Sequence, residues 1–392
     1  MIFLVIYCKY LLLLRIASIK FMNLVNKSSV SSNPRIGCMK FQLNKKAFII
    51  AFCACVLTVA LVFYGSRKLQ NFDPALVAYL FGTVFAQFGI VYRYCVWLQK
   101  PPTWMYFKRG WQLLFSKSFF EYTVLSVQKL VRNIAFQRFI YPRGKLRWWG
   151  HFLLATGCLI AFAVTIPLTL GWIHFTMNPA TSINPADTNY YEAHVFGFKA
   201  MEFKLGSPMA FFIFHILNWC SWLVIIGCLL FMRRRLTHAG QIATQTFEGD
   251  WLPLILLMAI SVTGLGLTYD YEFLRGTTYE FMAVTHAVTV ILFLIWIPFG
   301  KFFHIIQRPA QVGAHLYKKE GMKKGMAICP HTHKPFATQM HINDLKIVTK
   351  QLGYDFTLED GSSHLDLSPE GKRSALARAH LKAREASGKF FG

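Results

Sequence analysis

His286 and His304 stand eighteen residues apart on one apolar stretch, EFMAVTHAVTVILFLIWIPFGKFFH. On a continuous α-helix this spacing is about five turns, so both imidazoles would leave the same face, roughly 27 Å apart. That separation is close to the thickness of the hydrocarbon core of a bilayer. Because a polar group without a partner is costly in lipid, an intramembrane histidine indicates a functional site, and histidine is a common axial ligand of haem iron. The spacing predicts ligands to two metal centres at two depths.

The composition places these histidines in a membrane protein. The chain has 392 residues, of which 54% are hydrophobic and 16% aromatic. These values are typical of a polytopic membrane protein rather than a soluble globule. We therefore predict an all-α fold, a bundle of about six transmembrane helices with a cytoplasmic C-terminal tail. The predicted spans are 46–65, 74–98, 148–173, 209–232, 251–269 and 278–304.

The formal charge of +24 raises the possibility of nucleic-acid binding, but its distribution favours a membrane topology instead. Lys and Arg crowd segment 100–147, the loop after Arg233 and the tail after Lys301, whereas connections 66–73, 174–207 and 270–277 carry few cations. This alternation follows the positive-inside rule and predicts that both termini and the basic loops are cytoplasmic. Contact with membrane lipid is expected, and nucleic acid is not.

The chain divides into four predicted parts. Residues 1–45 are interpreted as a signal-like segment or a mis-assigned start, with Met22 or Met39 as the true start. Residues 46–73 form an extra transmembrane helix, 74–310 a haem-binding bundle, and 311–392 a tail that docks a partner. Segment 102–147 predicts one or two amphipathic helices, 174–207 an ordered outer loop, and Ser368-Pro369 the start of a basic helix. The nine cysteines are scattered without C-x-x-C spacing, so no iron–sulfur cluster is expected in this chain.

Two further histidines complete the predicted cofactor sites. With the helices placed by topology, His151 shares the inner depth of His304, and His215 lies near the outer depth of His286. Each pair is interpreted as the ligands of one six-coordinate haem b, which makes an electron path across the membrane. Small residues that would let a porphyrin approach are Gly150, Ala155, Gly157, Gly264 and Gly266. The alternative is that these histidines form hydrogen bonds between helices or lie at the membrane interface.

Three stretches carry a resemblance to a known family. They are GHFLLATGCLIAFAVTIPLTLGWIHF, LLFMRRRLTHAGQIATQTFEGDWLPLILLMAISVTGLGLTY and THAVTVILFLIWIPFGKFFHIIQRP. Over residues 74–312 the sequence resembles the membrane cytochrome b (gamma) subunit of respiratory nitrate reductase and the related subunits of heterodisulfide-reductase-like complexes. The resemblance implies a subunit that oxidises quinol near an outer haem. It also implies electron transfer inward to an iron–sulfur subunit attached to a molybdenum-containing catalytic subunit.

Carried over by position, the resemblance assigns His151 and His304 to the inner haem and His286 to the outer haem. The family's second outer ligand falls at Ala161 in this chain, and His215 is our replacement, chosen on depth alone. Lys204 matches a lysine near the family's quinol, where a cation would stabilise the charge that develops on oxidation. Asp187, Glu192 and His194 are candidates to accept the quinol protons, with ordinary loop polarity as the alternative.

Three interpretations of the function remain at this stage. The leading hypothesis is a dihaem quinol oxidoreductase subunit that anchors a cytoplasmic partner and passes electrons to it. The alternatives are a transporter with a histidine proton relay, and an anchor subunit with a single haem. Cys329, His331, His333 and His341 have the composition of a metal site, but their spacing favours a polar docking loop. Neither the terminal acceptor nor the direction of electron flow follows from the sequence.

Overall fold

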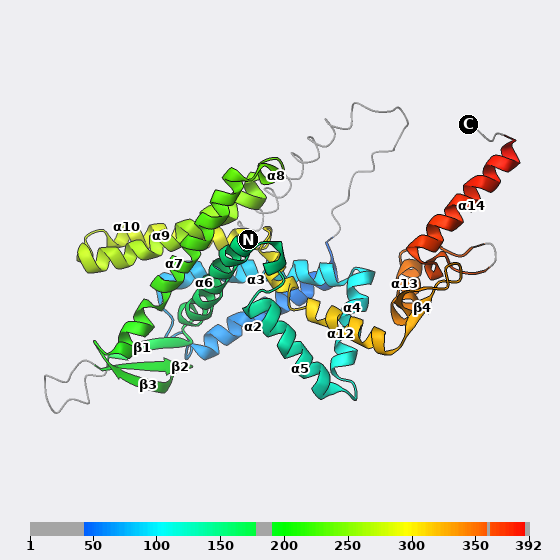
Figure 1. Cartoon of the computed structure of the whole chain (residues 1–392). Coiled ribbons are helices and arrows are strands. Elements are labelled where there is room, and N and C mark those ends of the chain that lie inside the picture. The colour runs from blue at the N-terminus through cyan, green and yellow to red at the C-terminus, as the bar shows by residue number, and fades with distance from the viewer. Residues whose placement is uncertain (1–42, 178–189, 359–360, 389–392) are drawn as a thin grey trace. The chain divides into compact units, whose positions relative to one another are not determined.

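In the part of the chain that the structure describes, six long apolar helices make up the membrane region. The computed structural model describes residues 43–177, 190–358 and 361–388, so the expected start at Met22 or Met39 lies outside the described residues. The helices are α2 (Lys45–Gly65), α3 (Val77–Leu98), α6 (Lys145–Thr169), α7 (Pro208–Thr237), α9 (Leu252–Phe273) and α10 (Tyr279–Trp296) (Figure 1). All six helical segments are long and apolar enough to cross a membrane. The prediction of an all-α polytopic bundle is confirmed.

Local sequence explains where several of these helices begin. The Asn44 side chain accepts a hydrogen bond from the Ala47 N–H, 3.1 Å away, at the start of α2. Ser207 caps α7 in the same way through the Ala210 N–H, and Pro208 occupies the first helical turn. Such side chains satisfy N–H groups that have no partner within the helix. Proline in the first turn costs no hydrogen bond, because an N–H at that position would have no acceptor within the helix.

The last predicted span, 278–304, is wrong as a single helix. Helix α10 ends at Trp296, a run of turns follows, and His304 lies on the separate short helix α11 (Phe303–Gln307). Pro298 explains the break, because proline has no N–H to donate and disfavours helical backbone at the residue before it. The five-turn register between His286 and His304 therefore does not exist.

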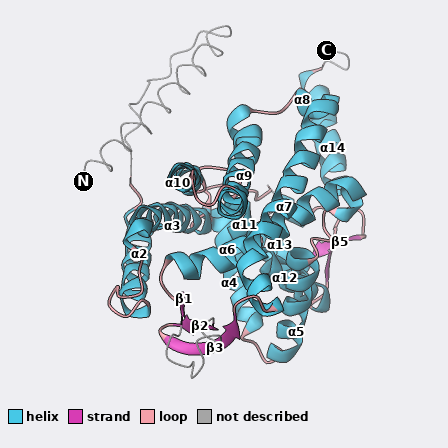
Figure 2. Ribbon diagram, turned by 90° about the vertical axis from the view of Figure 1, so that its left-hand side faces the viewer, coloured by secondary structure: helices cyan, strands magenta, loops and turns pink. Residues whose placement is uncertain are grey.

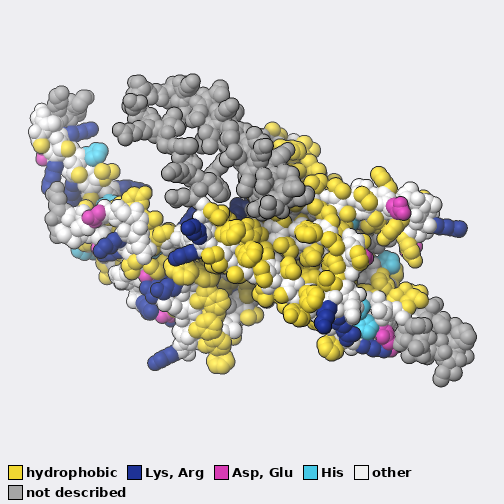
Figure 3. All heavy atoms as spheres, turned by 180° about the vertical axis from the view of Figure 1, so that it is seen from behind, with side chains coloured by type: hydrophobic (Ala, Val, Ile, Leu, Met, Phe, Trp, Pro, Cys, Tyr) yellow, Lys and Arg dark blue, Asp and Glu magenta, His cyan; other side chains and the backbone are white. Residues whose placement is uncertain are grey.

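The core of the bundle lies where α6, α7, α9 and α10 meet. Its buried members are Leu154, Val224, Cys228, Leu254, Leu257 and Phe293. Close packing of α6 on α7 depends on glycine, because a Cβ on Gly157 would lie 2.8 Å from the Cys220 carbonyl oxygen. Helices α2 and α3 join the bundle through contact of α3 with α10. Hydrophobic side chains cover the middle of the face in Figure 3, as expected for a surface in lipid.

The connections contain more structure than predicted. Segment 100–147 forms the expected amphipathic helices, α4 (Pro101–Leu114) and α5 (Phe119–Leu130). The expected outer loop 174–207 instead contains an antiparallel sheet of β1 (Ile173–Met177), β2 (Tyr190–Val195) and β3 (Phe198–Lys204). Its buried Ala193 and Phe203 pack with Ala210 at the start of α7. Aromatic residues such as Phe175, Tyr191 and Phe203 favour extended strands, which explains the sheet.

The tail is a small folded unit rather than a simple extension. It comprises α12 (Gln311–Lys323), the hairpin of β4 (Met326–Ile328) and β5 (Pro335–Thr338), α13 (Gln339–Gln351) and α14 (Pro369–Ser387). Helix α14 starts where predicted, with Ser368 accepting a hydrogen bond from the Gly371 N–H. Helix α12 packs on α4 and α5, so the tail is held by the amphipathic segment (Figure 2).

Buried Asp344 joins the tail to the amphipathic segment. Arg109 of α4 donates two hydrogen bonds to its carboxylate, at 2.8 and 3.3 Å, and Tyr317 of α12 donates a third at 2.8 Å. These bonds raise the pKa of Arg109, chiefly through the hydrogen bond to Asp344. A second contact pairs Glu121 of α5 with Lys319 and Lys323. Two helices of the tail and the distant α4 thus meet at one carboxylate.

Asp344→Ala is expected to loosen the tail. It removes the acceptor from one side of Arg109 and the nearer acceptor of the buried Tyr317 hydroxyl, which keeps only the Met340 backbone oxygen at 3.3 Å. This loss should cost about 1–3 kcal/mol of stability. Limited proteolysis should then cut residues 324–388 faster than in the wild type. Glu370→Ala is the matched control, since its 3.8 Å ion pair with Lys334 is largely exposed and should contribute little. Equal cleavage rates in the two variants would contradict this role for Asp344.

Candidate haem-binding site

The structure brings His151 and His304 together. The centroids of the two imidazole rings lie 6.4 Å apart, with 64° between the ring planes. An imidazole nitrogen lies about 2 Å from a metal that it binds, so two rings at this separation are close enough to hold one metal between them. The structure therefore brings the predicted inner pair within reach of a single bound group.

Hydrogen bonds orient both rings. Nδ1 of His151 lies 2.5 Å from Oε1 of Gln137, and Nδ1 of His304 lies 2.6 Å from the backbone oxygen of Lys301. Because both partners are oxygen acceptors, each Nδ1 carries the proton and Nε2 is left with the lone pair that binds a metal. This is the usual arrangement of metal-binding histidines, whose second nitrogen donates to an oxygen.

Gln137 is the site residue that sequence reasoning missed. It is buried, 4% exposed, and has a positive φ of 49° in the turn before α6. The rings of Phe139 and Phe231 stand edge-on to His151 at 6.4 Å. Since Gln137 lies among basic and aromatic residues of no recognisable pattern, nothing in the local sequence marks it. These side chains give the inner site an apolar wall and one fixed hydrogen-bond acceptor.

The predicted outer pair is not brought together. His286 faces α9, where its Nδ1 lies 2.9 Å from Thr263 Oγ1 and its Cε1 lies 3.3 Å from the position of a Cβ on Gly264. The His215 ring stacks on Phe211 at 4.2 Å, and its Nδ1 lies 2.9 Å from the Phe211 backbone oxygen. Among the described residues, no ring contact joins His215 to His286. Each ring is oriented through Nδ1, as in the inner pair.

Most of the glycines proposed to admit a porphyrin serve helix packing instead. Gly150 and Gly157 face side chains or backbone of α7, and Gly266 faces Met282 of α10. Gly264 alone among these four glycines lies against one of the predicted ligands, His286. The small residues of α6 are thus explained by close approach of two helices, which is their frequent role in membranes.

Gly157→Val is expected to force α6 away from α7. Its side chain would meet the Cys220 carbonyl oxygen and Val224, and overpacking of this kind costs about 1–3 kcal/mol. We expect a lower unfolding temperature in detergent, measured by circular dichroism. Ala163→Val is the control, because Ala163 lies on the exposed face of the same helix. Equal unfolding temperatures would show that the helices do not pack as described.

The residues predicted to handle quinol lie on or beside the sheet. Lys204 is exposed at the end of β3, opposite Tyr190 of β2. Glu192 pairs with Lys199 at 2.6 Å, and its carboxylate lies 3.4 Å from Nε2 of His194. His194 also stacks on His174, with centroids 4.9 Å apart. Asp187 lies outside the described residues.

The tail residues with metal-ligand composition do not form a metal centre in the described part of the chain. Cys329 is fully buried beside the first turn of α14, where the Ser368 N–H donates to its sulfur at 3.2 Å. Burial favours the thiol, but hydrogen bonds from Ser368 and Thr332 outweigh it and lower the pKa of Cys329 to about 6. The segment is a packed hairpin turn.

Comparison with known proteins points to an oxidoreductase complex. The chain is 24% identical over 260 residues to a subunit of dihydromethanophenazine:CoB–CoM heterodisulfide reductase from Methanosarcina mazei, covering 62% of this chain and 89% of that protein. It is 23% identical over 255 residues to the corresponding protein of Methanosarcina acetivorans, covering 62% and 88%. No family model and no solved structure matches the chain.

These findings establish the general class of protein. A multi-pass membrane protein similar to a subunit of an oxidoreductase complex agrees with the predicted electron-transfer role. The similarity is to heterodisulfide reductase, whereas the predicted likeness to nitrate reductase gamma subunits stays a prediction.

Proposed function

We propose that this chain is a b-type cytochrome subunit that takes electrons from a membrane quinol and passes them to a soluble reductase partner. The observation that carries the proposal is the pair of His151 and His304, 6.4 Å apart with both Nδ1 atoms held by oxygens. A haem bound there would supply reversible one-electron chemistry, and His151 and His304 would hold it, with the rings of Phe139 and Phe231 beside His151. His286 and His215 are proposed as ligands of a second, outer haem.

The quinol site is proposed at the sheet end of α7. Lys204 closes β3 just before that helix, and His215 lies about two turns into it. There a lysine side chain can hydrogen-bond a quinol oxygen, and Glu192 and His194 can accept protons. Electrons would then travel toward the end of the bundle that carries Arg147 and Arg308, which we place in the cytoplasm by the positive-inside rule.

The partners are proposed from the same reasoning. The relatives are subunits of heterodisulfide reductase. The acceptor that we propose at the basic end is an iron–sulfur subunit. A molybdenum-containing catalytic subunit is the further partner that the nitrate reductase resemblance implies. The folded tail, held on α4 and α5, is proposed as the surface that docks the partner.

A single-haem anchor is the second candidate. It is favoured by the absence of ring contact between His215 and His286 among the described residues, in contrast to the close inner pair. The pyridine haemochrome assay on the purified wild-type chain separates these functions. Two b haems per chain support the dihaem protein, one supports the anchor, and none would refute both.

A further inference from the structure

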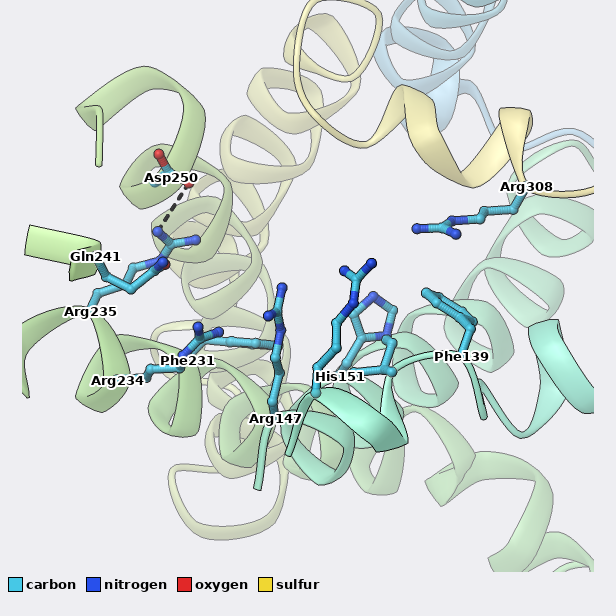
Figure 4. Close-up of a pocket in the computed structure, with 11 residues that line it drawn as sticks. Phe139, Arg147, His151, Phe231, Arg234, Arg235, Gln241, Asp250 and Arg308 are labelled. Atoms are coloured by element: carbon cyan, nitrogen blue, oxygen red, sulfur yellow. Dashed lines mark ion pairs between the residues drawn. The ribbon is translucent and has the colours of Figure 1, made fainter. Parts of the chain in front are cut away.

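A pocket lined by arginines lies beside His151 of the inner histidine pair. Its volume is about 260 Å³, and its lining includes His151 and five arginines (Arg143, Arg147, Arg234, Arg235 and Arg308). The arginines come from the turn before α6, from α6, from α7 and from the segment after α11. In Figure 4, Arg147 and Arg308 extend toward the pocket with the His151 ring between them in this view. Segments distant in sequence thus concentrate positive charge beside one proposed ligand.

The positive charge of this pocket is not balanced by protein carboxylates. Asp250 is the one acidic residue of the lining, and it pairs with Arg235 at 3.0 Å and with Lys301 at 2.7 Å. In the described part of the chain, no ion pair to a carboxylate engages the other four arginines. Arg308 lies over the Phe139 ring at 4.2 Å, and burial and then the nearby Arg143 lower its pKa. Clustered cations of this kind are stable when an anion sits among them.

The position of the arginines relative to the histidines identifies the anion. Arg147 precedes His151 by four residues on α6, and four residues on a helix return to the same face. Arg308 follows His304 by four residues and directly follows α11. Both proposed ligands therefore have an arginine about one turn away in the direction of the pocket. A group held by both imidazoles would present one edge to these arginines.

We propose that this pocket binds the propionate carboxylates of the haem held by His151 and His304, with Arg147, Arg234 and Arg308 as their partners. The inference rests on the proposed haem function. The pocket volume is below that of sites for drug-sized ligands, so it suits the polar edge of the group and not the whole ring. Guanidinium groups pair with carboxylates through two parallel hydrogen bonds, which would fix the orientation of the haem.

The charge of the pocket also has a redox consequence. Reduction of haem iron adds one negative charge, and nearby cations stabilise the reduced form more than the oxidised form. Each of these arginine charges therefore raises the midpoint potential of the inner haem. Replacement by glutamine should shift the oxidation equilibrium toward the ferric form by at least tenfold, which corresponds to about 59 mV for one electron.

The test is a potentiometric titration of the purified full chain, followed at the Soret band. The variants are Arg147→Gln, Arg234→Gln and Arg308→Gln. Arg233→Gln is the control, since Arg233 neighbours Arg234 on α7 but does not line the pocket. We expect a lower potential for one haem in the three pocket variants and the wild-type potential in the control. Arg308→Lys, which keeps the charge, should recover most of the shift.

Haem content and bound phospholipid, measured on the same samples, complete the design. Loss of haem in Arg308→Gln but not in Arg308→Lys also supports the pocket. Normal haem content with unchanged midpoint potentials would overturn the propionate assignment. A fall in bound phospholipid without a shift in midpoint potential would also overturn it and would assign the pocket to an anionic lipid. A wild-type chain without haem would instead refute the proposed function itself.

Discussion

His304→Ala is expected to remove one haem b from each chain. A six-coordinate haem needs both axial imidazoles, and the structure offers His304 as the ring 6.4 Å from His151. The pyridine haemochrome assay should show a fall of one haem per chain in His304→Ala and in His151→Ala alike. Electrons would leave the chain from the inner haem, so quinol-dependent reduction of a soluble acceptor should fall by more than about 10–100-fold, the loss that follows removal of a metal ligand's hydrogen-bond partner.

His341→Ala is the matched control for this experiment. His341 is a half-buried histidine of α13, in the tail, and its ring contacts Tyr317 at 6.4 Å. Its replacement should leave the haem content unchanged. If His304→Ala kept the full wild-type haem content, the inner site would have to be abandoned.

His286→Ala and His215→Ala form the second decisive pair. If the two residues share an outer haem, each variant should retain one haem of two, with the inner haem spectrum intact. A redox titration that separates the b-type signals resolves the question further, since the component with the potential of the outer site should vanish in both variants. His238→Ala, at the end of α7, is the control and should keep both haems.

The haem content of His215→Ala decides whether His215 or another residue is the second ligand of the outer haem. Full haem content in His215→Ala, together with loss of a haem in His286→Ala, would remove His215 and require another ligand opposite His286. His286 lies against Gly264 and Thr263 of α9, whereas His215 stacks on its own helix neighbour Phe211. An outer haem held by both would therefore lie between helices whose histidines are not in contact in the protein alone.

Prediction of the fold succeeded where the physical signal is local. A run of about twenty apolar residues forms a transmembrane helix whatever surrounds it, because backbone polar groups in lipid must be satisfied within the segment. The start of α14 at Ser368-Pro369 followed from the same kind of local rule. The error at 278–304 had a local cause as well, since Pro298 stands within the apolar run and ends the helix there.

The sequence by itself determined the six membrane helices and the residue types able to hold a haem. Only the tertiary structure decided which of these residues meet. It placed His304 beside His151 after the break at Pro298, supplied Gln137 as the hydrogen-bond acceptor, and gathered arginines from α6, α7 and the segment after α11 into one pocket. Helix formation depends on neighbours along the chain, whereas a site between helices depends on side-chain packing between segments far apart in sequence, which periodicity does not encode.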